Sequence, residues 1–159
     1  MQQTKKNQGF TLIELMVTVA IMAIIAMMAA PSFGDMILSQ NLNRSAQEFI
    51  GQLNNARSQA VLERKEVTVK LNKTFDSLTT TEKTDFAVKK LLIWSSQGKS
   101  VLKTGSPTEI TFLLSGGVKN FAADINGKPF IICNKSGGNK SKNISISLMG
   151  TIQVTEGTC

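Results

Sequence analysis

The sequence of 159 residues contains no histidine and no tyrosine, one tryptophan and only two cysteines. Without histidine, the most common general base and a usual metal ligand are both missing. No cluster of metal-ligating residues is found, and the Ser-Gly-Gly at residues 115–117 is a turn signal, not a phosphate-binding loop. These absences leave little support for an enzyme, and we expect no cofactor and no metal site.

The charges that are present have an excess of one sign. Lys and Arg number 18 against 11 Asp and Glu, which gives a formal net charge of +7. Such an excess suits anionic partners, but in a small domain it more often belongs to a solvated surface. Charge alone therefore identifies no partner.

One long apolar run lies near the N-terminus. Residues 15–30 form it without a break, and Thr18 is its only polar side chain. Together with the apolar residues just before it, the run approaches the roughly 20 residues that cross a bilayer. A secretory signal would have its cleavage site after the apolar core, whereas here a short basic and polar segment, residues 1–9, precedes it. We therefore expect a membrane anchor.

Glu14 is the exception in this apolar segment. A carboxylate near the centre of a spanning helix costs about 2.5–3.5 kcal/mol on insertion scales, and less toward the edge. A charge kept at that cost is a candidate functional group that needs a positive partner. The alternative is an edge residue that reaches the lipid head groups at little cost.

The stretch GFTLIELMVTVAIMAIIAMMAAPSF, which begins at Gly9, resembles the N-terminus of type IV pilins and type II secretion pseudopilins. The resemblance implies that a prepilin peptidase in the membrane cuts between Gly9 and Phe10 and N-methylates the new amine of Phe10. It also implies that Glu14 is an assembly residue, which pairs with the terminal amine of a neighbouring subunit as the filament grows. Two desolvated opposite charges need each other, because an unpaired buried charge is far less stable than a paired one.

Periodicity predicts one long helix followed only by strands. Apolar residues recur at steps of three and four, which predicts a helix from about Thr11 to Arg64, roughly 80 Å long. The positions on its buried face are Leu38, Leu42, Ala46, Phe49, Leu53, Ala56 and Ala60. Alternating or short apolar runs then predict strands at 67–71, 110–114 and 144–148, with further candidates at 87–96, 99–103, 129–133 and 151–154. The predicted fold is α+β, the type IV pilin fold: a long N-terminal helix, transmembrane in its first half, packed against an antiparallel β head.

The two cysteines are Cys133 and Cys159. An anchor of this kind implies export to an oxidising compartment, so we expect a disulfide that pins the tail. The alternative is a pair of unrelated free thiols. Residues 134–143, NKSGGNKSKN, lie inside the segment that the bond would close, and we expect them to form an exposed, mobile loop between strands.

The second half of the helix narrows the resemblance. The stretch NRSAQEFIGQLNNARSQAVLERKEVTV resembles the subfamily of minor pilins and pseudopilins that includes FimT, FimU and the secretion pseudopilin H, as do PFIIC and ISISLMGTIQV near the end. DNA-uptake members carry a glycine-arginine-any-arginine motif, and the matching stretch here, Gly150-Thr151-Ile152-Gln153, lacks both arginines. The remaining candidates for a weak DNA contact are the loop lysines Lys135, Lys140 and Lys142.

These observations predict four segments: a cleaved leader (1–9), a transmembrane assembly helix (10–33), its amphipathic continuation (34–64) and a β-rich head (65–159). The resemblance implies a minor pilin that helps to start type IV pilus assembly at or near the tip. The alternatives are a DNA-binding minor pilin for natural transformation and a minor pseudopilin of a type II secretion system. The implied partners are the prepilin peptidase, other minor and major pilins, and the assembly platform. The implied location is the bacterial inner membrane with a periplasmic head, and then the pilus.

Overall fold

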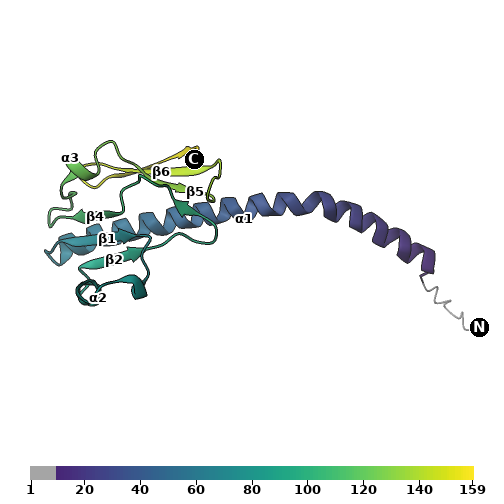
Figure 1. The fold of residues 1–159 in the computed structure, drawn as a ribbon, viewed down its shortest axis with the longest axis horizontal. Helices are drawn as coiled ribbons and strands as arrows, with labels where there is room; N and C mark the ends of the chain where they lie inside the picture. Colours follow the sequence, from purple (N-terminus) through teal and green to yellow (C-terminus); the bar gives the residue numbers. More distant parts are fainter. Residues whose placement is uncertain (1–9) are drawn as a thin grey trace, which may run out of the picture. The chain divides into compact units, whose positions relative to one another are not determined.

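The computed structural model describes residues 10–159, so the predicted leader, including Gly9 of the cleavage site, lies outside the described residues. Figure 1 shows a long helix followed by short strands and helices. The elements are α1 (Leu12–Leu62), β1 (Val67–Leu71), η1 (Phe75–Ser77), α2 (Thr80–Ala87), β2 (Leu91–Trp94), β3 (Val101–Leu102), β4 (Glu109–Phe112), α3 (Phe121–Asp124), β5 (Phe130–Cys133), β6 (Ser141–Ile146) and β7 (Ile152–Gly157). The chain divides into two compact units, one ending at Ile37 and the other spanning Leu38–Cys159.

Within Leu38–Cys159, the head, one face of α1 is buried. Its apolar residues follow the predicted steps of three and four, because that spacing keeps them on one side of a helix. The buried set is Leu42, Ala46, Phe49, Leu53, Ala56 and Ala60. Phe49 is fully buried, and its ring centroid lies 5.1 Å from those of Trp94 and Phe130. The helix therefore supplies the centre of the core.

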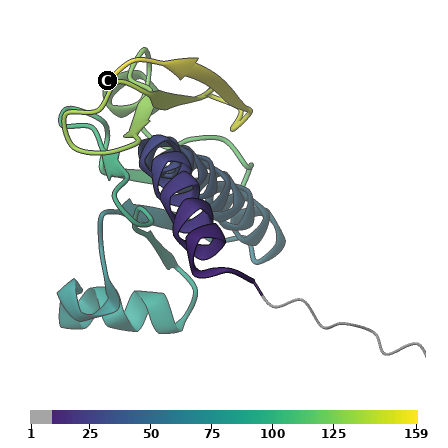
Figure 2. The same ribbon diagram turned by 90° about the vertical axis from the view of Figure 1, so that its right-hand side faces the viewer.

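Two small sheets complete the head. One has the strand order β2-β1-β4, and the other has the order β3-β5-β6-β7. Figure 2 shows the two sheets on different sides of the helix. Their inward residues, such as Val69, Phe112 and Ile144, are buried against it. The α+β fold of a long helix packed against a β head is confirmed.

The pairing within the sheets holds one feature that alternation does not predict. All adjacent pairs are antiparallel except β1 and β2, which run parallel. A parallel pair needs a crossover connection, and the segment from η1 through α2 supplies it.

The expectation that only strands follow the long helix is wrong. The structure adds η1, α2 and α3 to the head, and none of them has a buried residue. Apolar periodicity has nothing to detect in such elements. The start of α2 does have a local signal, because Thr79 and Glu82 form a reciprocal capping box.

Several predicted strand and loop limits also change. β4 ends at Phe112 and β6 at Ile146, so Leu114 and Leu148 lie in exposed turns that follow the strands. These turns contain Gly116 and Gly150, whose φ angles are +80° and +77°. The predicted loop 134–143 is shorter than expected, because its last three residues already belong to β6.

Candidate functional site

The first part of α1 is an apolar helix that the described chain leaves uncovered. Every large apolar side chain between Phe10 and Met28 is at least half exposed, from 50% at Val17 to 85% at Phe10. Soluble proteins do not leave a continuous apolar surface of this kind in water. These side chains therefore require lipid or the helices of other chains around them.

Glu14 lies in the first turn of this helix. Its main-chain N–H donates to the Thr11 side-chain oxygen over 3.3 Å, and the Leu15 N–H donates to the Thr11 carbonyl over 3.2 Å. Thr11 thus caps the helix, and the carboxylate of Glu14 stands at the positive end of the helix dipole. Among residues 10–159 no cation forms an ion pair with Glu14. The Thr-x-x-Glu spacing of Thr11 and Glu14 is a capping signal that can be read from the sequence.

The one hydroxyl of the apolar run is satisfied inside the helix. The Thr18 hydroxyl donates to the Leu15 carbonyl over 2.9 Å. A polar side chain bonded in this way can enter hydrocarbon without an unpaired donor. Two parts of α1, Leu12–Met28 and Phe33–Leu62, were compared with the length and composition of a membrane span. Among the described residues no single helical part meets both requirements, whereas these two taken together do.

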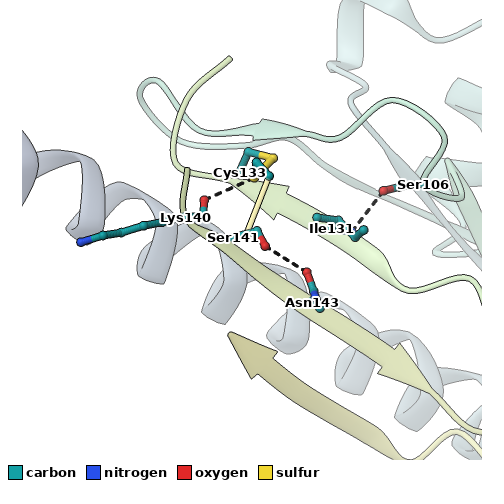
Figure 3. The surroundings of a disulfide bond; sticks show 7 residues. Ser106, Ile131, Cys133, Lys140, Ser141 and Asn143 are labelled. Carbon is teal, nitrogen blue, oxygen red and sulfur yellow. Dashed lines mark hydrogen bonds between the residues drawn. A yellow bond between two sulfur atoms is a disulfide. The ribbon is translucent and has the colours of Figure 1, made fainter. Parts of the chain in front are cut away.

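A disulfide links two parts of the β3-β5-β6-β7 sheet of the head (Figure 3). Cys133 ends β5 and Cys159 follows β7; their sulfur atoms are 2.04 Å apart and their Cα atoms 5.9 Å apart. Ser141 of β6 pairs with Cys133 on one side and Gly157 on the other, so the bond passes over the start of β6. Cys133 and Ser141 are buried. The disulfide thus holds the last strand to the sheet.

The three lysines predicted as a DNA contact have different surroundings. Lys142 lies on β6, where its Nζ is 2.7 Å from a carboxylate oxygen of Glu156 on β7. The hydrogen bond from Lys142 lowers the pKa of Glu156. Lys135 and Lys140 are exposed, and Figure 3 shows the Lys140 side chain extending away from the disulfide. Only two of the three cations are therefore free of an ion pair among the described residues.

These lysines lie far from the stretch where DNA-uptake relatives carry arginines. Ser141 pairs with Gly157 at one end of the β6–β7 hairpin, whereas Ile146 pairs with Ile152 at the other end, beside Gly150. At about 3.3 Å per residue, roughly 15–20 Å separate the two ends. The structure does not bring the lysines to the position of the missing arginines.

A depression of the head lies on the outer face of the β2-β1-β4 sheet. It has a volume of about 530 Å³, and Thr68 and Thr111, with hydroxyls 2.8 Å apart, lie in its lining. Its charges neutralise each other in part, since Lys119 binds Glu66 over 2.7 Å. Among the described residues, no group of three or more His, Cys, Asp or Glu side chains is placed to hold a metal ion. Nothing in this lining selects a particular ligand.

An uncovered apolar helix with a capped glutamate at its start, continuing into a small β head closed by a disulfide, defines a protein of the type IV pilin class. The comparisons with known proteins agree. The prokaryotic N-terminal methylation motif matches residues 4–30, and the model of the type II transport protein GspH matches residues 45–150. The chain belongs to the GspH family and is a minor pilin or pseudopilin of that type, as the resemblance implied.

Two fimbrial proteins of Pseudomonas aeruginosa are similar to the chain. Each is 41% identical over 63 residues, which is 40% of this chain and 40% of the relative. The match thus spans well under half of the length of these curated relatives. No solved structure matches the chain. The families that match are structural proteins.

Proposed function

We propose that this chain is a minor pilin of the FimU or FimT kind, which helps to start type IV pilus assembly and sits at or near the tip. The observation that carries the proposal is the apolar first part of α1. Its large side chains from Phe10 to Met28 are at least half exposed, and Glu14 in its first turn has no ion-pair partner among the described residues. Before assembly, lipid covers this surface and the head lies in the periplasm. The helices of other pilins cover it in the filament.

The predicted processing fits this geometry. A cut by the prepilin peptidase between Gly9 and Phe10 would place the new, methylated amine directly before the Thr11 cap. Because that amine lies at the positive end of its own helix, a carboxylate of another chain is a favourable partner for it. Glu14 of a neighbouring subunit supplies that carboxylate, and the pair removes the cost of two isolated charges in an apolar surrounding. The assembly platform of the inner membrane would be where the two chains meet.

The alternative within the same class is a minor pseudopilin of a type II secretion system. The match to the family of the type II transport protein GspH favours it, whereas the similarity to two fimbrial proteins favours a pilus. Deleting the gene and scoring surface pili, secreted protein and DNA uptake in one strain separates the two. Loss of pili supports our proposal, and loss of secretion with normal pili refutes it.

DNA capture is the weaker alternative. Duplex DNA would meet the two exposed lysines, Lys135 and Lys140, and no arginine in the 150–153 stretch. Such contacts predict weak binding without sequence preference, with a slope of log affinity on log salt of about −2. Enzyme activity has no support in the families that match or in the lining of the depression beside Thr68 and Thr111.

The assembly role of Glu14 is tested by Glu14→Gln, which removes the charge and keeps the shape, with Thr18→Val as the matched control in the same helix. Both variants should enter the membrane and be cleaved. We expect Glu14→Gln to lower the amount in sheared filaments about tenfold or more, since a desolvated ion pair is lost, and Thr18→Val to leave it nearly unchanged. Incorporation of Glu14→Gln at the wild-type level would contradict the assembly role and would favour the alternative of an edge residue that reaches the lipid head groups.

A further inference from the structure

β7 has the one long uncovered strand edge in the described head. Among the other outermost strands, β2 lies against α2, and β3 has only two residues. The outer edge of β4 is partly occupied, because the Lys119 N–H donates to the Thr111 carbonyl over 2.9 Å. β7 has six residues and pairs with β6 alone. An edge of this length is a template for another strand.

The phase of the ladder shows which groups of β7 are free. The Ser147 N–H donates to the Thr151 carbonyl, so these two residues form a hydrogen-bonded pair. In an antiparallel ladder such pairs recur at every second residue. Along β7 the next hydrogen-bonded positions are therefore Gln153 and Thr155. The main-chain N–H and C=O groups of Ile152, Val154 and Glu156 therefore point away from β6. No strand among the described residues accepts or donates to them.

The side chains on this edge suit an added strand. Ile152 packs against the core, but Val154, which lies opposite the fully buried Ile144, is still 43% exposed. β7 contains no proline and no lysine, the residues that commonly block an edge, and the carboxylate of Glu156 is held by Lys142. The apolar inner surface of the sheet therefore continues to the edge and stops there uncovered.

We propose that the free edge of β7 binds an extended segment of another pilin subunit as an additional strand. Only an extended backbone can satisfy the N–H and C=O groups of Ile152, Val154 and Glu156 together. That the donor is a pilin rests on the function proposed above. Near Gly157 a depression of about 250 Å³ includes Lys140 in its lining, so the donor segment should carry a carboxylate at that end.

Residue-resolved amide hydrogen exchange on the full-length protein gives the direct test. In detergent micelles the amides of Val154 and Glu156 should exchange fast, whereas those of Gln153 and Thr155 are protected by β6. In sheared filaments, protection of Val154 and Glu156 should rise about tenfold or more, because strand addition gives them acceptors. Fast exchange of both amides in filaments that contain the protein would overturn the proposal.

Val154→Pro is the matching variant, since it removes an N–H that only an added strand would use, and proline is tolerated in an edge strand on that side. Gln153→Ala, which leaves the main chain intact, is the control. With the Cys133–Cys159 disulfide formed in both, Val154→Pro should lower incorporation into filaments about fivefold or more and Gln153→Ala should not. Equal incorporation contradicts the added strand. If Val154→Pro does not form the disulfide, the exchange experiment decides.

The two proposals fail in different ways. Absence of the wild-type protein from filaments contradicts the pilin role. Its presence there with unprotected β7 amides contradicts only the strand addition.

Discussion

Gly150 shows how one residue sets the path of the chain at the turn between β6 and β7. Its φ is +77°, and a Cβ added there would come within 2.6 Å of the Gly116 carbonyl oxygen and 3.0 Å of the Arg57 side chain. The Arg57 Nε donates to that same carbonyl over 3.1 Å, so three parts of the head meet at this point. Packing is therefore enough to explain a glycine at position 150, the first residue of the stretch that matches the DNA-uptake motif.

We predict that Gly150→Ala destabilises the head by about 2–4 kcal/mol, because it adds a contact with backbone to the strain of a positive φ. Gly105→Ala is the control, since Gly105 has a φ of +90° but nothing within 4 Å of its added Cβ. It should cost only about 1 kcal/mol. Denaturant unfolding of the full chain in detergent measures both. Equal costs would show that the close approach at Gly150 is of no consequence.

Glu82 links α2 to the sheet. Its carboxylate accepts from Lys70 Nζ over 2.6 Å and from the Thr79 N–H over 2.7 Å. The hydrogen bond from Lys70 has the largest effect on the pKa of Glu82, followed by the bonds from Thr79. Together they lower this pKa from 4.5 to about 2. The same pair raises the pKa of Lys70. The carboxylate form is thus stabilised in the folded head.

A depressed pKa contributes stability above the unfolded value and loses it as the pH falls. We therefore predict that Glu82→Gln lowers the melting temperature near neutral pH, by a small amount because the pair is only partly buried and solvent still screens it. The difference should shrink between about pH 4.5 and pH 2, where wild-type Glu82 becomes protonated. Melting curves over that range check it, and a difference that does not change with pH would contradict it.

At the scale of elements, apolar periodicity predicted α1 but not α2, which has no buried residue. The core face of α1 follows from apolar spacing, and the structure buries those residues from Leu42 to Ala60 as expected. One polar residue lies at the border of this face: Arg57 is partly buried, and its Nε donates to the Gly116 carbonyl over 3.1 Å. Periodicity describes which face is buried, but not which polar side chain of its border bonds to a distant turn.

Gly51 gives a prediction about the helix itself. It lies inside α1, is exposed, and has no atom within 4 Å of an added Cβ. Gly51→Ala should therefore stabilise the head by about 0.5–1 kcal/mol, because alanine loses less backbone freedom in a helix. The same unfolding experiment measures it. Destabilisation would mean that another chain, or a bend of the helix, needs the glycine.

For the whole molecule, the disulfide connects the last strand to the centre of its sheet. It spans 26 residues of sequence, which corresponds to about 3.5 kcal/mol in the chain-entropy model. We predict that Cys159→Ser lowers the free energy of unfolding by about 2–4 kcal/mol. The tail after β7 should also become accessible to protease. A change below about 1 kcal/mol would show that packing alone holds β7.

The class of fold could be predicted from the sequence, whereas the arrangement of the head could not. The alternation of Val67, Val69 and Leu71 predicts a strand but says nothing about its neighbours, so the parallel pairing of β1 with β2 was not foreseen. The free edge of β7 could not be predicted either, because it depends on which strands lie at the edges of each sheet. Glu14 and the two cysteines were found from sequence because their chemistry is unusual for their places.

The central proposal is that the chain is a pilin that is cut before Phe10, so that the processed chain begins there. Intact-mass measurement of the protein from sheared filaments tests it most directly. We expect the mass of a chain from Phe10 to Cys159 with one methyl group on the terminal amine and one disulfide. A mass that includes residues 1–9, in protein that has nonetheless entered filaments, would contradict it.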